Sequence, residues 1–374
     1  MKQHTTSRRT GNAAIAQTKV SACTTLAIDL AKRVFQVVGE DAGGRVVYEE
    51  RIPSREAFGT FLRRLPAGIT VLMEVGPGAQ AWARQVQALG RSVRILPAQR
   101  VEEHRSGAKN DRNDARAILR AGRDVSIAAV PVKGVAALAM QALHRVRQGG
   151  VRRRTALGNQ MRGLLLEHGI ALAQGDPGLT RGVDRVLEDA TQPIPDLLRE
   201  LIGDLQAEWL SLGKRIDGLT GQLDTVARND PKARQLMTVR GIGPIIATAL
   251  IAKQTEPERF ASARQFAAYF GIVPDQHSSG QRVRLGKMSK RGDAYVRSLV
   301  IQGAHAVLQQ LRSTSEQPDD RRLLRWRQRL GQKGAAVRLA NRNLRIAWVM
   351  LRTDQVYRRQ PIDQAGTTEI AMVH

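Results

Sequence analysis

The segment Leu26-Ala-Ile-Asp-Leu-Ala-Lys32 sets the fold of the N-terminal part of the chain, because one carboxylate interrupts an otherwise apolar run. The apolar residues predict a buried strand, in which Asp29 costs free energy unless something pairs with its charge. Val71-Leu-Met-Glu74 repeats this pattern just before the turn Gly76-Pro77-Gly78. The two strand-end carboxylates, Asp29 and Glu74, can therefore converge if both strands belong to one sheet.

The segments around these two strands predict a mixed α/β domain. Three antiparallel strands are expected at residues 24–28, 34–38 and 45–50, with a turn at Asp41-Ala-Gly-Gly44 before the third. A helix opened by Ser54, a strand at 69–73, a helix near 79–89, a strand at 93–96 and a helix from Asp111 follow. This order of elements suggests an RNase H-like fold.

Two further acids stand at the start of the last of these helices. Asp111 and Asp114 are three residues apart, so both lie on one helical face, and four acids could share a pocket. Phosphodiester chemistry needs such a set, because carboxylate-bound divalent ions, Mg²⁺ by preference, activate the attacking oxygen and stabilise the leaving one. Simpler roles stay open for single residues: Asp29 could cap a turn, Glu74 could pair with an arginine, and Asp111 could cap the helix.

The composition indicates a partner that is a polyanion. Lysine and arginine total 59 against 34 acidic residues, a formal net charge of +25, which favours nucleic acid. A membrane surface is the rival partner, but no segment has the ~18 consecutive apolar residues of a spanning helix. The chain also lacks a glycine-rich phosphate loop followed by lysine, which disfavours a nucleotide-dependent kinase.

The single cysteine, Cys23, excludes a disulfide framework and a cysteine zinc cluster, and it fits a reducing cytoplasm. Cys23 opens an apolar run, which favours packing over a role as a nucleophile.

Five parts are expected along the chain. They are a disordered basic tail at 1–21, the α/β domain at 22–130, a helical or coiled-coil segment at 131–234, a mainly α domain at 235–352 and a tail at 353–374. In the third part Leu198, Leu205, Leu212 and Leu219 recur every seventh residue, which suits either self-association or an ordinary buried helix face. Residues 235–351 carry 20 basic and 7 acidic residues, so this part should face nucleic acid.

Two motifs in the fourth part suggest contacts with phosphate. Residues 236–244, with the sequence LMTVRGIGP, predict a helix-hairpin-helix turn in which Arg240, Gly241 and Gly243 approach a phosphate; a tight turn without a ligand is the alternative. A polar loop at 275–280 then leads into a basic run that should neutralise a phosphate backbone unless it is merely a solvated face. The basic residues chosen as nucleic-acid contacts are Arg282, Arg284, Lys287, Lys290 and Arg291, together with Arg152, Arg153 and Arg154 in the helical segment.

Several of these motifs resemble those of one family, the DEDD transposases of insertion sequence family 110, particularly its subgroup 1111. The resemblance runs from about residue 26 to 351. The matching stretches are AIDLAK at 27–32, Met73-Glu74, QAWAR at 80–84, KNDRNDA at 109–115, GIGP at 241–244, RQFAAYFGIVP at 264–274, SSG at 278–280 and MSKRG at 288–292. The chain departs from the family pattern after Glu74, where it has Val75-Gly-Pro-Gly78 and Gln80-Ala81.

The resemblance implies a RuvC-like nuclease domain whose four acids are Asp29, Glu74, Asp111 and Asp114, holding Mg²⁺ or Mn²⁺. A helical coiled-coil segment and a transposase domain would follow. The family's nucleophilic serine precedes the glycine of a Ser-Gly motif, which corresponds to Ser279; it would form a transient phosphoserine link to DNA. Implied partners are donor and target DNA, a structured bridge RNA and further copies of the chain in a dimer or tetramer, in the bacterial cytoplasm at the nucleoid.

Two other functions remain compatible with these residues. A nuclease of the Holliday-junction resolvase type would use the same four acids to activate water, without a serine. A non-catalytic nucleic-acid-binding protein would use the basic helices alone, and its acids would be structural.

Overall fold

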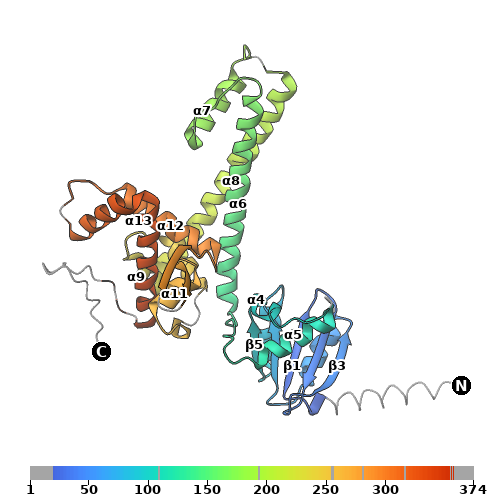
Figure 1. Ribbon diagram of the computed structural model, residues 1–374. Helices are drawn as coiled ribbons and strands as arrows, with labels where there is room; N and C mark the ends of the chain where they lie inside the picture. The colour runs from blue at the N-terminus through green and yellow to red at the C-terminus, as the bar shows by residue number, and fades with distance from the viewer. Residues whose placement is uncertain are drawn as a thin grey trace. The chain divides into compact units, whose positions relative to one another are not determined.

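The computed structural model describes residues 20–107, 110–192, 194–253, 257–279, 282–315, 317–353, 355 and 357. Side chains are described for these residues except at 277–285, where only the backbone is given. The chain forms two compact units, Met1–Gly134 and Val135–His374. Figure 1 shows the first as a sheet with helices and the second as almost wholly helical. The expected domain boundaries near 130 and 234 stay predictions.

The first unit is built on a five-stranded sheet in the order β3-β2-β1-β4-β5. The strands are β1 Thr25–Leu30, β2 Phe35–Glu40, β3 Val46–Ile52, β4 Thr70–Glu74 and β5 Ser92–Leu96. β1, β2 and β3 pair antiparallel, whereas β4 and β5 run parallel to β1. This topology is consistent with the expected RuvC-like domain, and each predicted strand is confirmed with ends shifted by a few residues.

The helices of the first unit are α2 Arg55–Arg63, α3 Ala79–Ala88, α4 Ala98–Glu102 and α5 Asp111–Arg123. Side chains alternate between the two faces of a strand, so each face has its own core. One core contains Leu26 and Ile28 with Trp82 of α3 and the stacked rings of Phe35 and Phe58. The other contains Ala27, Leu72 and the buried side of α5. Sequence patterning did not predict the short helix α4.

Two details of the first unit bear on the expectations. Val20, inside the predicted N-terminal tail, is buried in the core of the sheet, while residues 1–19 lie outside the described residues. Cys23 is buried in the same core, and burial raises the pKa of its thiol to about 11. A neutral, buried thiol agrees with a packing role.

The second unit begins with two long helices, α6 Val135–Leu166 and α8 Asp196–Asn229, which lie side by side in Figure 1. The shorter α7 Gly175–Glu188 packs beside the C-terminal part of α6 and the N-terminal part of α8. Leu198 and Leu212 of the heptad repeat are buried, and Leu198 belongs to a core shared with Met161 of α6 and Leu179 of α7. The repeat is thus used, at least in part, for packing within the chain, which is the plainer of its two explanations.

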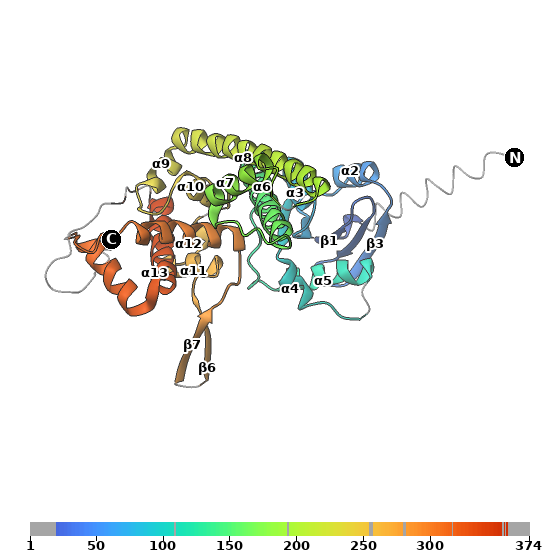
Figure 2. The same ribbon diagram turned by 90° about the horizontal axis from the view of Figure 1, so that it is seen from above.

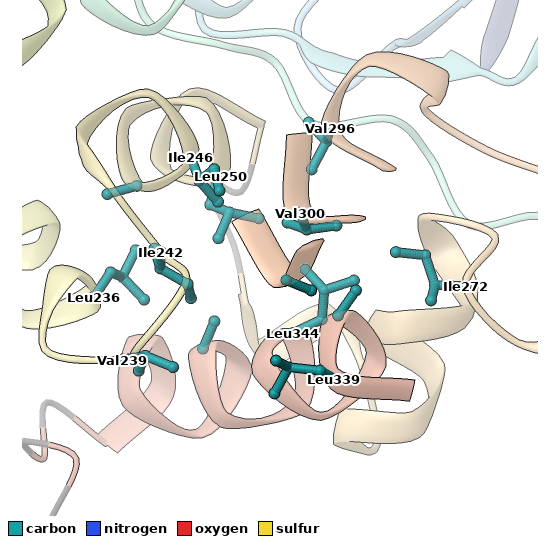
Figure 3. Packing of buried hydrophobic residues seen from close by; sticks show 14 of the residues in the cluster. Leu236, Val239, Ile242, Ile246, Leu250, Ile272, Val296, Val300, Leu339 and Leu344 are labelled. Carbon is teal, nitrogen blue, oxygen red and sulfur yellow. The ribbon is translucent and has the colours of Figure 1, made fainter. Parts of the chain in front are cut away.

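The rest of the second unit is a helical domain. Its elements are α9 Pro231–Met237, α10 Pro244–Lys253, the 3₁₀ helix η1 Pro257–Arg259, α11 Ala263–Tyr269, α12 Ala294–Gln309 and α13 Pro318–Thr353. Figure 3 shows its core, in which Leu236 and Ile242 meet Leu250 of α10, Val300 of α12 and Leu344 of α13. No helix of the described chain is both long and apolar enough to cross a membrane.

A β-hairpin projects from this helical domain and is prominent in Figure 2. Its strands are β6 Pro274–Ser279 and β7 Arg282–Met288, paired antiparallel with Ser279 opposite Arg282. The prediction of a polar loop at 275–280 is therefore wrong for 275–279; residue 280 lies outside the described residues. The segment has almost no apolar residues, so strand periodicity gave no signal, and cross-strand backbone pairing defines the strand instead.

Candidate active site

The strand ends of β1 and β4 place two carboxylates on one side of the sheet. Ala27 and Leu72 both face the core formed with α5. Asp29 and Glu74 are two residues further along their parallel strands, so they point to the same face as Ala27 and Leu72. Asp29 and Glu74 are only partly exposed. The sheet therefore directs both acids toward α5.

The first turn of α5 supplies the other two acids. Asn110 caps the helix, accepting a hydrogen bond of 2.8 Å from the backbone N–H of Asn113. Asp111 is therefore not the cap, and its carboxylate is exposed within the first turn. Carboxylates at this position are stabilised by the positive end of the helix dipole. The alternative role of Asp111 as the helix cap is therefore wrong, because Asn110 is the cap.

Ion pairs along α5 hold the helix on the sheet. Arg112 and Arg116 contact Glu49 of β3, with an Arg112 Nη2–Oε2 distance of 2.9 Å. At the other end of the helix, Arg123 Nε donates a 2.9 Å hydrogen bond to the buried carboxylate of Glu40 on β2. These contacts fix the position of Asp111 and Asp114 relative to β1 and β4.

The four acids interact electrostatically. Burial raises the pKa of Asp29 to about 6, with further raising contributions from the charges of Asp114, Asp111 and Glu74. Burial also raises the pKa of Glu74, and the charge of Asp114 adds to that effect. Like charges held this close are unfavourable unless a cation joins them. The structure thus brings all four predicted acids into one electrostatic cluster.

A positively charged residue that the sequence did not indicate completes this cluster. Arg105, in the loop between α4 and α5, lies with its Nε 2.8 Å from Oδ1 of Asp114. The contact is an ion pair without hydrogen-bond alignment. The charge of Arg105 also lowers the pKa of Asp29 and of Glu74, which opposes the effect of burial. No spacing rule links Arg105 to acids on three other elements, so local sequence carried no signal for it.

The side-chain arrangement is not itself a closed metal site. Among the described residues, no three His, Cys, Asp or Glu side chains come together in a group that could hold a metal ion. Asp114 points to Arg105, and Asp111 is exposed. Carboxylate oxygens are nonetheless the donors that Mg²⁺ and Mn²⁺ prefer.

The segment after Glu74 has a structural role that the sequence motif did not reveal. Gln80 of α3 donates to the carbonyl of Pro131 at 3.1 Å and accepts from the N–H of Lys133 at 2.7 Å. Arg84, one helical turn later, donates to the carbonyl of Lys133 at 3.0 Å. These bonds fix the strand-like segment that leads out of the sheet unit. The QAWAR motif therefore anchors the chain at that point.

The hairpin that carries Ser279 is held at its base by two glycines. Gly271 and Gly292 have φ values of 69° and 112°, which only glycine adopts readily. A Cβ at Gly271 would clash with the backbone of Arg291, and one at Gly292 with the backbone of Tyr269. The two ends of the hairpin thus cross in close contact. This explains the glycines in the FGIVP and MSKRG motifs, and it fixes where the hairpin leaves the helices.

The predicted helix-hairpin-helix turn connects α9 and α10. Gly241 has a φ of 92°, and a Cβ there would press on Gly303 of α12. The guanidinium of Arg240 forms an ion pair with Asp320 of α13. The backbone carbonyl of Arg240 accepts a 2.9 Å hydrogen bond from Nδ2 of Asn343. Gly243 has open space around its Cα. Arg240 is thus engaged inside the protein, and a phosphate at this turn stays a prediction.

The other predicted nucleic-acid contacts differ in their exposure. Arg152 and Arg153 are exposed on α6, whereas Arg154 stacks on Trp209 with its Cζ 3.6 Å from the ring centroid. Lys287, Lys290 and Arg291 are exposed at the base of the hairpin. The side chains of Ser279, Arg282 and Arg284 lie outside those described.

Comparison with known proteins gives the family. A model described as "Transposase", for the DEDD group of IS110, matches residues 26–170, and one described as "Transposase IS116/IS110/IS902 family" matches residues 233–318. A "Probable family 20 transposase" of Pseudomonas aeruginosa is 41% identical over 338 residues, covering 89% of this chain and 98% of the relative. The chain belongs to the IS110 family of transposases.

Two further relatives of this transposase come from other bacteria. The transposase of insertion sequence element IS1111A from Coxiella burnetii is 32% identical over 336 residues, which are 89% of this chain and 91% of the relative. The transposase of element IS1328 from Yersinia enterocolitica is 34% identical over 342 residues, which are 89% of this chain and 98% of the relative. The family expectation is therefore confirmed, and the carboxylate cluster lies inside the region matched by the DEDD transposase model.

Proposed function

We propose that this transposase cleaves and rejoins DNA through a composite site, in which Asp29, Glu74, Asp111 and Asp114 bind divalent ions and Ser279 is the nucleophile. The observation that carries the proposal is that Asp29 interacts electrostatically with Glu74, Asp111 and Asp114, with Asp29 and Glu74 on the face of the sheet that α5 covers. Burial, and after it the charges of Asp114, Asp111 and Glu74, raise the pKa of Asp29, and a perturbed carboxyl group of this kind supports a role in binding or catalysis.

The residues fit Mg²⁺ or Mn²⁺ by the chemistry of their donors, provided that Asp114 exchanges its contact with Arg105 for the ion. Such ions would supply Lewis-acid stabilisation to the oxygens of a phosphodiester. Burial raises the pKa of Asp29 to about 6, so Asp29 would serve as a carboxylate ligand only above about that pH. Arg105 would then be free to contact another anion, and the DNA phosphate is the obvious one.

The chemical step conserves the energy of the phosphodiester. The Ser279 hydroxyl loses its proton as its oxygen bonds to phosphorus, the bond from phosphorus to one deoxyribose oxygen breaks, and that oxygen takes up a proton. Rejoining reverses these steps with a hydroxyl of another DNA end, which releases the serine. The hairpin β6–β7 is suited to presenting Ser279, because its crossing glycines fix the base from which it projects.

The test is a DNA cleavage assay with a substrate carrying the element's ends, comparing Ser279→Ala, Asp29→Asn and the neighbouring control Ser278→Ala. We expect Ser278→Ala to retain cleavage and a covalent protein–DNA species on denaturing gels. Ser279→Ala should lose both, and Asp29→Asn should lose cleavage. Cleavage that persists in Ser279→Ala without a covalent species would favour the resolvase-like alternative, in which water is the nucleophile. Recombination that persists in Asp29→Asn would favour structural acids.

We also propose that a structured RNA guides the reaction and that the active assembly is a dimer or tetramer. Two basic regions could hold RNA and DNA. One consists of the exposed Arg152 and Arg153 on α6, and the other of Lys287, Lys290 and Arg291 where the hairpin leaves the helices. Recombination assayed with and without transcription of the non-coding DNA beside the gene tests the guide. Recombination that is unchanged without that RNA would contradict it, and sedimentation with and without the RNA would give the assembly state.

A further inference from the structure

The first half of α13 carries a row of arginines to which no role has yet been assigned. Arg321, Arg325 and Arg329 are spaced four residues apart and are all exposed. Successive members of such a row rise by about 6 Å along one side of the helix, so the three guanidinium groups form a ridge. The ridge ends at Gly331, whose φ of 70° and ψ of 171° break the helix. Figure 2 shows α13 bending, with its first part at the border of the helical domain.

The other arginines of α13 are mostly occupied inside the protein. Arg342 contacts Asp319 at 3.0 Å, and Arg322 pairs with the same carboxylate. Arg327 donates to the carbonyl of Leu308 at 3.2 Å, and Arg338 lies over the ring of Trp326. The ridge residues Arg321, Arg325 and Arg329 have no side-chain partner among the residues that the structure describes. The helix therefore sorts its arginines into an inner, paired set and an outer, free set.

Beyond its first turn, the helix that carries the ridge has no acidic residue. From residue 321 to 353 the sequence has ten basic residues and not one acidic residue. The two acids of the first turn, Asp319 and Asp320, are both engaged, Asp319 as above and Asp320 with Arg240. Unpaired guanidinium groups in a row are unfavourable by mutual repulsion and become favourable when a chain of phosphates lies along them.

We propose that Arg321, Arg325 and Arg329 bind the sugar-phosphate backbone of duplex DNA, without reading its sequence. This rests on the DNA substrate of the proposed function, and it adds a contact surface distinct from the hairpin and from the turn at Gly241. DNA is favoured over RNA because the family acts on DNA and because an exposed, straight helical ridge matches a continuous duplex backbone. Arginine contacts to phosphate position a protein on DNA and leave specificity to other contacts.

The test measures binding to a duplex of arbitrary sequence as a function of salt, without divalent ions and in an Asp29→Asn background, so that cleavage plays no part. Replacing all three arginines by glutamine should weaken binding about tenfold and lower the slope of log K against log salt by about 3. The loss should be the same for unrelated duplexes. Unchanged circular dichroism melting would show that the fold is intact, as expected for three exposed side chains.

A matched control is available on α7. Arg181 and Arg185 have the same spacing and exposure as Arg325 and Arg329, but Asp184 and Glu188 lie beside them. The pair Arg325→Gln and Arg329→Gln should lower the slope by about 2, whereas Arg181→Gln with Arg185→Gln should leave it almost unchanged. Equal effects of the two pairs would show a general charge effect and overturn the proposal. Weakened binding of a structured RNA with duplex binding intact would also overturn it. Because the assay needs no chemistry, its outcome is independent of whether Ser279 is the nucleophile.

Discussion

Each of the two units of this transposase contains an ionisable group that is shielded from solvent, but the two groups have opposite surroundings. In the sheet unit, burial and three neighbouring carboxylates raise the pKa of Asp29 to about 6. In the helical unit, burial lowers the pKa of His144 to about 4, but the neutral ring has a partner at each nitrogen. These partners are Tyr295 Oη at 3.0 Å and Thr248 Oγ1 at 3.1 Å.

The difference between Asp29 and His144 separates a functional site from a structural contact. His144 joins α6 to α10 and α12 with its hydrogen-bonding capacity satisfied. Asp29 is held among like charges, and the charge of Arg105 offsets part of the repulsion. Local conflict of this kind is expected where a protein needs it for binding or catalysis. Four predictions test how far this contrast extends, from the largest effect to the smallest.

The largest effect should come from Asp29→Asn. This change removes one metal ligand, so cleavage should fall by roughly 10³-fold or more. It also removes a repelled charge, so the metal-free protein should become more stable at pH 7, by about 1–3 kcal/mol. Single-turnover cleavage and chemical unfolding without divalent ions measure the two effects. A variant that is both inactive and destabilised would show that Asp29 supports the fold.

His144→Ala should do the opposite to stability. It leaves a cavity and takes a hydrogen-bond partner from Thr248 and from Tyr295, so the free energy of unfolding should fall by about 2–4 kcal/mol. Tyr295→Phe, which removes one of the two bonds, is the milder control and should cost about 1 kcal/mol. Denaturant unfolding of the three proteins gives the comparison. A neutral His144→Ala would remove the contrast between the two units.

The contributions of Asp29 and His144 to the free energy of unfolding should change with pH in opposite directions. The raised pKa of Asp29 means that its stabilising effect is greatest below its ordinary value near 4 and is lost as pH rises to about 6. The lowered pKa of His144 means that stability is present above about 6.5 and is lost as pH falls toward 4.

Each contribution is on the order of 1–3 kcal/mol. Amide hydrogen exchange between pH 4 and 7 without metal, corrected for the intrinsic exchange rate at each pH, measures the two contributions separately in β1 and in α10. Slopes of the same sign in both elements would contradict the assignment.

The smallest effect should come from Arg105→Gln. If Arg105 competes with a metal ion for Asp114, its loss should tighten Mn²⁺ binding by a few-fold, in line with one partly exposed ion pair. Arg100→Gln is the control, because Arg100 pairs with Glu103 on an exposed part of α4. Calorimetric titration with Mn²⁺ decides the matter, and weaker binding in Arg105→Gln would mean that Arg105 orients Asp114 for the metal.

Much of the sheet unit could be predicted from the sequence, because its signals are local. Continuous apolar runs mark β1 and β4. Once these strands pair in parallel, the two-residue spacing from Ala27 to Asp29 and from Leu72 to Glu74 places both acids on one face. Asn110 before Asp111 is a helix-start signal of the same kind. The family motifs led to the same four acids independently.

The helical unit was less predictable, because its decisive contacts join distant segments. The strand β6 has no apolar alternation, and its pairing with β7 depends on the crossing of Gly271 and Gly292. The heptad leucines suggested two packing partners equally well, and only the fold shows Leu198 packed against α6 and α7. Periodicity identifies a buried face but not what buries it.

From the sequence alone one can read the order of strands and helices along the chain, the positions of Asp29 and Glu74 at strand ends, the spacing of Asp111 and Asp114, and the excess of positive charge. The elements and spacings follow from apolar runs and from the helical period of about 3.6 residues, and the charge follows from the composition. Only the folded chain shows that Arg105 meets Asp114, and that α13 pairs one set of arginines while Arg321, Arg325 and Arg329 have no side-chain partner among the described residues. The physical reason is that charge pairing depends on distance in space, and residues far apart in sequence reach that distance only after the chain has folded.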